Sequence, residues 1–282
     1  MIEFQHICKT WDDGSSALKS VNLTIPKGQF CVVLGPSGAG KSTLLRTINR
    51  LCIPTSGNVV IDGHALTRHN QQRLRQRVAM VHQHFNLSLR MSVSANVLAG
   101  VLPKTSMWRS LIGWFKPLHR ERACTLLEKV GLHPKHLQRR ASELSGGQQQ
   151  RVGIARAFML DPEIVLADEP VASLDPKISR DILQLIKDTA SEHNTTVLCS
   201  LHQIDLAREF ADRLIGMRDG AIVFDGTPAE FTDEMLNNLY QGAQWEDEKQ
   251  SAGSSPLEEQ QEQGEQQEQG LALASLQHQA AA

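Results

Sequence analysis

The sequence predicts an α/β protein in which helices cover a mainly parallel β-sheet, with an antiparallel β subdomain and a helical subdomain beside it. Short apolar runs rich in β-branched residues alternate with segments of helical period, and the runs at 30–34, 164–167 and 196–199 are the strand candidates. A segment with apolar residues at helical spacing lies between the last two runs. Strand, helix and strand in this order imply parallel strands covered by helices.

The elements follow from local patterns. Alternating strand-like pieces with glycine turns at 1–25 and 57–62 predict the antiparallel sheet. The strand at 30–34 ends in a glycine-rich turn, and a helix should follow over 41–49. The pattern over 84–142 is mostly helical, so we place the helical subdomain at about 84–160.

The helix between the last two strands has clear start signals. Asp175 should cap it and Pro176 suits its first position. Its apolar stripe is expected to consist of Ile178, Ile182, Leu185 and Ile186.

Charge divides the chain into a body and a tail. The 282 residues have a formal net charge of -2. Residues 243–282 hold eight acidic residues and one lysine, a local charge of -7, which leaves +5 on residues 1–242. Rich in glutamine and poor in large apolar side chains, the tail buries too little surface to offset its ordering entropy. We expect one domain over 1–242 and a disordered tail over 243–282.

Several protein classes are excluded. No apolar run approaches the roughly 18 to 20 residues that a membrane helix needs, and residues 1–5 lack the basic-then-apolar plan of a secretion signal. Five cysteines without a C-x-x-C pair predict reduced thiols rather than disulfides or a zinc site. The sequence therefore predicts a chain that neither spans a membrane nor is secreted.

A phosphate-binding loop lies between a predicted strand and a predicted helix. Residues 35–42, GPSGAGKS, match G-x-x-x-x-G-K-[ST]. Glycines let successive N–H groups point at phosphate oxygens, and the helix start adds the positive end of its dipole. Lys41 should reach the β- and γ-phosphates of a nucleotide, and the Ser42 hydroxyl should ligate Mg²⁺. The residues expected at the nucleotide here are Gly35, Pro36, Ser37, Gly38, Ala39, Gly40, Lys41, Ser42 and Thr43.

Two carboxylates complete the expected site. Asp168 and Glu169 follow the apolar run 164–167, at the carboxyl edge where open parallel sheets bind ligands. Asp168 is predicted to hold Mg²⁺, directly or through water, and Glu169 to orient and polarise the attacking water. A strand that ends in Asp-Glu is by itself commonly a solvated strand end. The phosphate loop upstream favours the catalytic interpretation.

A third motif decides the family. Residues 144–151, LSGGQQQR, lie shortly before the Asp-Glu strand. With this LSGGQ loop between the two phosphate-site motifs, the sequence resembles the ATP-binding subunits of ABC transporters over residues 1 to about 240. The resemblance implies a P-loop NTPase fold of the ABC type, with ATP and Mg²⁺ bound.

The motif also predicts a dimer. The Ser145 hydroxyl and the N–H groups of Gly146 and Gly147 at a helix start form a second anion cradle, with Gln148 beside it. This cradle is useful if two copies stack head to tail, each offering it to the γ-phosphate held by Lys41 of the other.

The resemblance implies roles for further residues. Gln83 matches the glutamine loop and would touch Mg²⁺ or the water. His202, after the strand at 195–200, matches the switch histidine that contacts the γ-phosphate. Trp11 takes the place of the aromatic residue, usually Tyr, that stacks on adenine. The dimer-interface loop would consist of Ser173, Leu174 and Asp175. Glu169, His202, Gln83 and Lys41 are then the expected catalytic set, and Ser42, Gln83 and Asp168 the metal set.

Several stretches resemble the ATPases of bacterial phosphonate importers, namely 48–51, 54–57, 83–87, 96–100 and 167–175. The resemblance implies uptake of phosphonates driven by ATP binding and hydrolysis. It also implies two membrane-spanning permease subunits, an indirect periplasmic solute-binding protein, and a peripheral place on the cytoplasmic face of the inner membrane. No residue of this chain is expected to touch the solute.

Alternatives stay open at this stage. The alternatives to a phosphonate importer are an importer of another small solute, such as phosphate or an amino acid, and a lipoprotein-release complex. A soluble ABC ATPase of DNA repair or of ribosomes is disfavoured, because the chain has one compact cassette and no basic stripe for nucleic acid. A non-catalytic regulatory subunit would be expected to have lost Glu169 or His202.

The insertion at 106–117 has two possible uses. Its residues Met107, Trp108, Leu111, Ile112 and Phe115 fall on one helical face. That face would dock a permease or pack on the body.

Overall fold

A six-stranded sheet is the centre of the computed structural model, which describes residues 1–106, 108 and 115–241. Its order is β10-β9-β3-β8-β7-β6, and all strands are parallel except β10, which is antiparallel to β9. The strands are β3 (Phe30–Leu34), β6 (Val78–Val81), β7 (Ile164–Asp168), β8 (Thr196–Ser200), β9 (Arg213–Arg218) and β10 (Ala221–Gly226). Because β3, β7 and β8 are buried along their whole length, they have continuous apolar runs rather than alternating ones.

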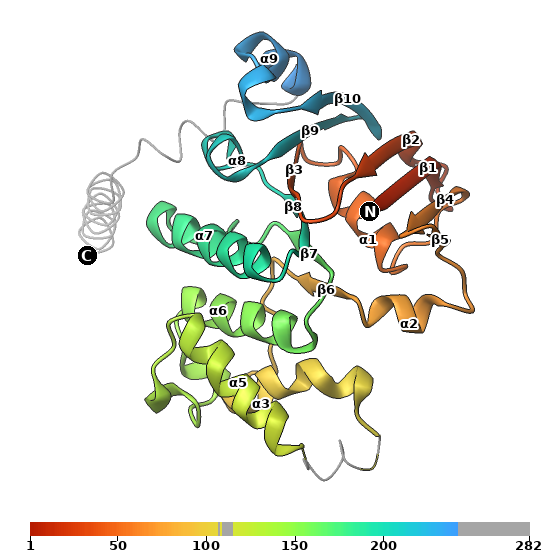
Figure 1. Ribbon diagram of the computed structural model, residues 1–282. Helices are drawn as coiled ribbons and strands as arrows, with labels where there is room; N and C mark the ends of the chain where they lie inside the picture. Colours follow the sequence, from red (N-terminus) through yellow and green to blue (C-terminus); the bar gives the residue numbers. More distant parts are fainter. Residues whose placement is uncertain (107, 109–114, 242–282) are drawn as a thin grey trace, which may run out of the picture. The chain divides into compact units, whose positions relative to one another are not determined.

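The second sheet is four-stranded and antiparallel, in the order β2-β1-β4-β5. Its strands are β1 (Ile2–Thr10), β2 (Ser16–Ile25), β4 (Ser56–Ile61) and β5 (His64–Ala65). Helix α1 (Lys41–Ile48) lies between the two sheets, and its Leu44, Leu45 and Ile48 join residues of both sheets in one apolar core (Figure 1). The predicted fold class, with a mainly parallel sheet and an antiparallel subdomain, is confirmed.

Helices α7 (Pro176–Glu192) and α8 (Ile204–Phe210) cover the other face of the six-stranded sheet (Figure 1). As predicted, Asp175 caps α7, accepting a hydrogen bond of 3.0 Å from the Ile178 N–H, and Pro176 follows in the first position. Two of the four residues predicted for the apolar stripe, Ile182 and Ile186, are fully buried, whereas Ile178 is only half-buried. Leu183 is fully buried and Leu185 only half-buried, because the face of α7 that meets the sheet is centred nearer Ile182 and Ile186.

Helices gather at one end of the described structure (Figure 1). They are α3 (Val93–Leu98), α5 (Pro117–Lys129) and α6 (Gly146–Ala157), with the 3₁₀ turns η1 (Ala99–Lys104), η2 (Pro134–His136), η3 (Ala141–Glu143) and η4 (Phe158–Leu160). The remaining elements are α2 (Gln71–Arg75), η5 (Pro228–Glu230) and α9 (Asp233–Tyr240). The helical character predicted after residue 84 is present, whereas the boundaries 84–160 and 1–242 stay predictions.

Parts of the predicted organisation lie outside the described residues. These are the tail 243–282 and, in the insertion, Met107, Leu111 and Ile112. Of the other two residues on that predicted face, Trp108 is exposed and Phe115 half-buried. Within 1–106, 108 and 115–241, no helix has the length and apolar character needed to cross a bilayer.

Candidate nucleotide-binding and catalytic site

The phosphate loop 35–40 joins β3 to α1, as the pattern predicts. Gly35, Gly38 and Gly40 have φ values of 150°, 80° and 99°. A Cβ at Gly35 would lie 2.1 Å from the Met217 carbonyl oxygen, and one at Gly40 would lie 2.4 Å from that of Ala17. Only glycine fits these two positions, so the loop is held in a tight curl against β2 and β9.

Lys41 is folded into this loop. Its ammonium donates hydrogen bonds to the carbonyl oxygens of Gly35 (2.7 Å) and Pro36 (3.1 Å), and the residue is only 4% exposed. Burial lowers the pKa of Lys41, while the charges of Glu169 and Asp168 oppose that shift. Among the described residues, no carboxylate lies within ion-pair distance of Lys41 Nζ. Its positive charge is therefore held where phosphate groups would enter the loop.

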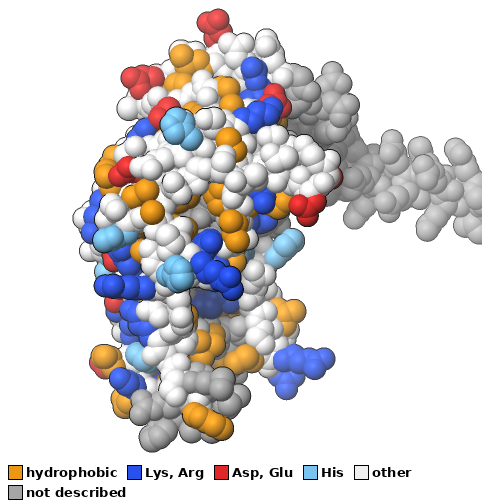
Figure 2. Space-filling model, turned by 90° about the vertical axis from the view of Figure 1, so that its right-hand side faces the viewer, with side chains coloured by type: hydrophobic (Ala, Val, Ile, Leu, Met, Phe, Trp, Pro, Cys, Tyr) orange, Lys and Arg blue, Asp and Glu red, His pale blue; other side chains and the backbone are white. Residues whose placement is uncertain are grey.

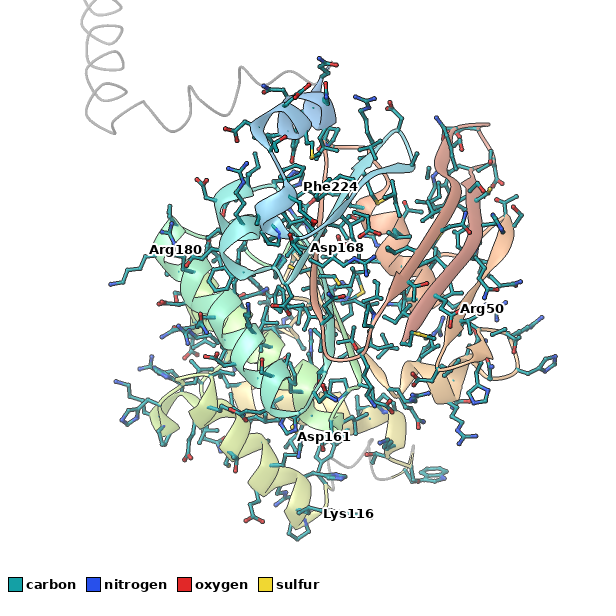
Figure 3. The ribbon with its side chains drawn as sticks, turned by 45° about the horizontal axis from the view of Figure 1, so that its top comes forward. Arg50, Lys116, Asp161, Asp168, Arg180 and Phe224 are labelled. Carbon is teal, nitrogen blue, oxygen red and sulfur yellow. The ribbon has the colours of Figure 1, made fainter. Side chains whose placement is uncertain are left out.

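Asp168 is the point where three elements meet. It ends β7, is 5% exposed and lies in the middle of the fold in Figure 3. Its Oδ1 accepts hydrogen bonds from Ser42 Oγ at 2.7 Å and from Ser200 Oγ at 3.0 Å. Its Oδ2 pairs with Arg46 Nη2 at 3.1 Å. The predicted metal residues Ser42 and Asp168 are thus brought together, with two further residues, Arg46 and Ser200, that sequence patterns did not single out.

Glu169 and His202, two of the four residues predicted to be catalytic, are in contact. His202 Nε2 lies 2.6 Å from Glu169 Oε1, and both side chains are partly exposed. Glu169 has a φ of 49°, a left-handed conformation that is uncommon for a residue with a side chain. Its backbone N–H donates to Ser200 Oγ at 3.0 Å. His202 therefore holds the carboxylate of Glu169 and Ser200 holds its backbone, while the side chain remains partly exposed.

Gln83 lies at the same edge of the sheet without touching the carboxylates. It comes two residues after β6, and β6 pairs in parallel with β7, Val81 opposite Ala167. The side chain of Gln83 is exposed and makes no hydrogen bond to Asp168 or Glu169. Its predicted contact with the metal or the water stays a prediction.

The LSGGQ residues begin helix α6. Ser145 Oγ accepts the Gln148 N–H at 3.4 Å, and Gln148 Oε1 accepts the Ser145 N–H at 3.0 Å, which is a capping box. A Cβ at Gly147 would lie 2.9 Å from Ile178 Cγ2, so the start of α6 packs closely on α7. In the part of the chain that the structure describes, no hydrogen bond joins these residues to the phosphate loop of the same chain.

The predicted interface loop, Ser173, Leu174 and Asp175, leads into α7. Asp175 is used as the cap of α7, and Ser173 is exposed. Leu174 Cδ2 lies 3.7 Å from a Cβ built at Gly146, so the loop contacts the LSGGQ helix. The loop 173–175 and the LSGGQ segment 145–148, which are both expected at the dimer interface, therefore lie side by side.

Trp11 lies in the hairpin between β1 and β2, where its backbone N–H donates to the Ser15 carbonyl oxygen at 2.8 Å. The residue is 46% exposed, and Lys9 Nζ lies 4.6 Å from the ring centroid. Strand β2 continues from this hairpin to Ala17, which borders Gly40. The hairpin is thus joined to the phosphate loop, with a flat aromatic face accessible to solvent.

Two polar residues of α6 connect the helical part to the site. Buried Gln150 donates from Nε2 to the Pro170 carbonyl at 2.7 Å, directly after Glu169. Arg156 donates to the carbonyls of Phe85 (3.1 Å) and Asn86 (2.7 Å), shortly after Gln83, and burial lowers the pKa of Arg156. The sequence gives no sign that Gln150 has a different role from the neighbouring Gln148 and Gln149. Its role becomes visible only once the fold is known.

Comparisons with known proteins agree with this geometry. A sequence family described as "ABC transporter" matches residues 18–172. The "Phosphonates import ATP-binding protein PhnC" of Hydrogenovibrio crunogenus is 50% identical over 241 residues, 86% of this chain and 89% of that protein. The protein of the same name from Staphylococcus aureus is 44% identical over 251 residues, covering 88% and 97%.

The fold has a solved counterpart. The dimeric post-hydrolysis state of the ATP-binding cassette MJ0796, bound to ADP and Pi, has a TM-score of 0.70 and 36% sequence identity, covering 81% of this chain and 99% of that chain.

Proposed function

Because the chain belongs to the ABC transporter family, we propose that it is the ATP-hydrolysing subunit of a phosphonate importer. The observation that carries the ATPase part is the meeting of the phosphate loop, Asp168, Glu169 and His202 at one edge of the sheet. The choice of solute rests on relatives at 44–50% identity that are named for phosphonate import. Solute contacts would belong to the partner subunits.

The nucleotide would lie across the phosphate loop and the β1–β2 hairpin. Backbone N–H groups of residues 37–43 and the ammonium of Lys41 would bind the phosphates. Lys41 would exchange its bonds to loop carbonyls for stronger bonds to phosphate oxygens. Trp11 would stack on the adenine ring.

The residues around Asp168 fit Mg²⁺. Ser42 and Asp168 offer a hydroxyl and a carboxylate 2.7 Å apart, which is the oxygen chemistry that Mg²⁺ prefers. Arg46, which pairs with the other oxygen of Asp168 at 3.1 Å, would compete with the ion for this carboxylate and would give way when Mg²⁺ binds. No group of three or more His, Cys, Asp or Glu among the described residues would hold a metal alone, so nucleotide phosphates would supply the other ligands. Bound Mg²⁺ would neutralise charge on the β- and γ-phosphates. Gln83 would join from the same sheet edge.

Glu169 is the base that would orient the attacking water. Its carboxylate is partly exposed at the mouth of the site, and His202 holds one carboxylate oxygen at 2.6 Å. From this position the His202 ring would also contact the γ-phosphate, so one histidine would sense the nucleotide and orient the base.

Two copies would form the working unit. Within one chain the Ser145–Gln148 segment does not reach its own phosphate loop, while a helix start with a capping serine suits a phosphate. A head-to-tail pair would bring this segment to the γ-phosphate bound by the other copy, with Ser173, Leu174 and Asp175 at the contact. The dimeric state of the MJ0796 cassette supports this arrangement.

Two membrane-spanning permease subunits would be the further partners, with a solute-binding protein acting through them. A cavity of about 170 Å³ opens between the sheet edge and the helical part. It is lined by Arg75, Gln76, Val78, Ala79, Met80, Gly100, Pro103, Arg156, Ala157, Leu160 and Pro162. Arg156 also donates hydrogen bonds to the segment that follows Gln83. A permease loop bound at this cavity would therefore be connected, through Arg156, to the part of the chain that carries Gln83.

The surface supports such a partner. Figure 2 shows Lys, Arg and His side chains spread over the middle of the face that lies on the right in Figure 1, with hydrophobic side chains among them. Leu51, Leu89, Met91 and Leu102 are exposed large hydrophobic residues. Docked on a permease, the chain would be a peripheral protein on the cytoplasmic face of the inner membrane.

Growth on different phosphorus sources tests the proposed solute. Deleting the gene in its host should abolish growth on a phosphonate as sole phosphorus source and leave growth on phosphate unchanged. The wild-type gene should restore growth, and a Glu169→Gln copy should not. If the deletion strain still grows fully on phosphonate while the purified chain hydrolyses ATP, phosphonate is not the solute, but the assignment as an ATPase stands.

A further inference from the structure

A buried serine connects the two carboxylates of the site. Ser200 is the last residue of β8 and is fully buried. Its hydroxyl donates to Asp168 Oδ1 at 3.0 Å and accepts the backbone N–H of Glu169, also at 3.0 Å. One hydroxyl has one proton and two lone pairs, so both bonds form at the same time. The same Asp168 oxygen accepts Ser42 Oγ, which makes a chain from α1 through β7 to β8.

Ser200 bonds to Glu169 at a position where the backbone is unusual. The left-handed φ of 49° at Glu169 turns the chain out of β7. At such a turn the N–H has left the sheet ladder and needs another acceptor. The Ser200 hydroxyl is that acceptor.

The end of β8 thus holds Glu169 at two points. Ser200 bonds the backbone N–H, and His202, two residues further along, lies at the carboxylate. Register explains the pairing, since Asp168 and Ser200 are direct neighbours on parallel strands. A shift of Asp168 toward a ligand would therefore pass through Ser200 to the backbone of Glu169.

We propose that Ser200 is a positioning residue for ATP hydrolysis, whose hydroxyl couples the carboxylate of Asp168 to the backbone orientation of Glu169. This inference rests on the roles proposed above for those two residues. It assigns Ser200 no contact with the nucleotide. Its loss should therefore affect the hydrolytic step and the gain in affinity from Mg²⁺ rather than the binding of metal-free ATP.

Steady-state kinetics of three variants test the proposal. Ser200→Ala should lower kcat by on the order of 10- to 100-fold, because it leaves a buried N–H without an acceptor, and should raise KM for MgATP by no more than about tenfold, because Lys41 and its loop are unchanged. Ser200→Thr keeps the hydroxyl and should recover most of kcat. The matched control is Thr195→Val, which removes another buried hydroxyl beside the same strand, one that donates to the Pro162 carbonyl at 2.9 Å. It should keep wild-type kcat.

Nucleotide binding gives a readout that does not depend on turnover. The affinity for a non-hydrolysable ATP analogue, measured with Mg²⁺ and with EDTA, should show a smaller gain from Mg²⁺ in Ser200→Ala, by about three- to tenfold, because Asp168 has lost one of its two hydroxyl donors. Thr195→Val should show the wild-type gain.

Clear outcomes separate the possibilities. Wild-type kcat together with a wild-type Mg²⁺ gain in Ser200→Ala would overturn the proposal, as would equal losses in Ser200→Ala and Thr195→Val. If Ser200→Thr fails to unfold cooperatively, Ser200→Cys takes its place and should give kcat between those of wild type and Ser200→Ala. Full turnover in Glu169→Gln would instead reject the role of Glu169, which is a different failure.

Discussion

Replacing Glu169 with glutamine should abolish ATP turnover, lowering kcat on the order of 10³-fold, while ATP binding persists. The amide has the size of the carboxylate but cannot take a proton from water. The phosphate-binding residues Lys41 and Ser42 lie on another element and are unchanged. ATP should therefore stay trapped between two copies, visible as a dimer in size-exclusion chromatography with light scattering. Phosphate release under saturating ATP measures the turnover.

The same substitution at Glu163 is the control. Glu163 directly precedes β7, at the end opposite Asp168, and pairs with Arg77 at 2.6 Å. Glu163→Gln should retain hydrolysis and form no ATP-stabilised dimer beyond that of the wild type. Steady-state hydrolysis that survives in Glu169→Gln would remove Glu169 from its role.

Lys41→Met should weaken ATP binding by on the order of 10²-fold. The methionine keeps the aliphatic stem in a position that is only 4% exposed, so the main loss is the ammonium. Without it, the β- and γ-phosphates enter the loop with one positive charge less in a partly desolvated site. Equilibrium titration with a fluorescent ATP analogue measures the affinity.

Lys19→Met provides the matched comparison. Lys19 lies exposed on β2, whose Ala17 borders the phosphate loop, and within the described residues no hydrogen bond or ion pair joins its side chain to a site residue. Its substitution should leave ATP affinity within about twofold, as expected for an exposed charge away from the ligand. Equal affinity in wild type and Lys41→Met would reject the assignment of the phosphate loop.

The sheet and the main site residues were predictable because local signals and fold agree. Strands β3, β7 and β8 are buried on both faces, so each is a continuous apolar run, and each is followed at once by a functional segment. Gly35, Asp168 and His202 lie at these strand ends, and the carboxyl ends of neighbouring parallel strands meet. The resemblance to ABC transporter ATPases, inferred from LSGGQ, is confirmed by the family match and the relatives.

Residues that act through long-range contacts could not be predicted in this way. Ser200 looks like one more strand residue until the register of β7 and β8 places it opposite Asp168. Arg46 has the pattern of a solvent-facing helix residue, and its bond to Asp168 spans 122 positions of the chain. Gln150 differs from Gln149 only in the face of α6 on which it lies. These contacts depend on how distant elements pack, which periodicity does not encode.

The central claim is that two copies of the chain form each ATPase site together. Copies with Lys41→Met and copies with Ser145→Arg test it, since neither homodimer has an intact site, while a mixed pair has one, with Lys41 from one copy and Ser145 from the other. Single-turnover hydrolysis should be absent from each variant alone and should reappear on mixing. No recovery on mixing, or full hydrolysis by Ser145→Arg alone, would contradict the shared site.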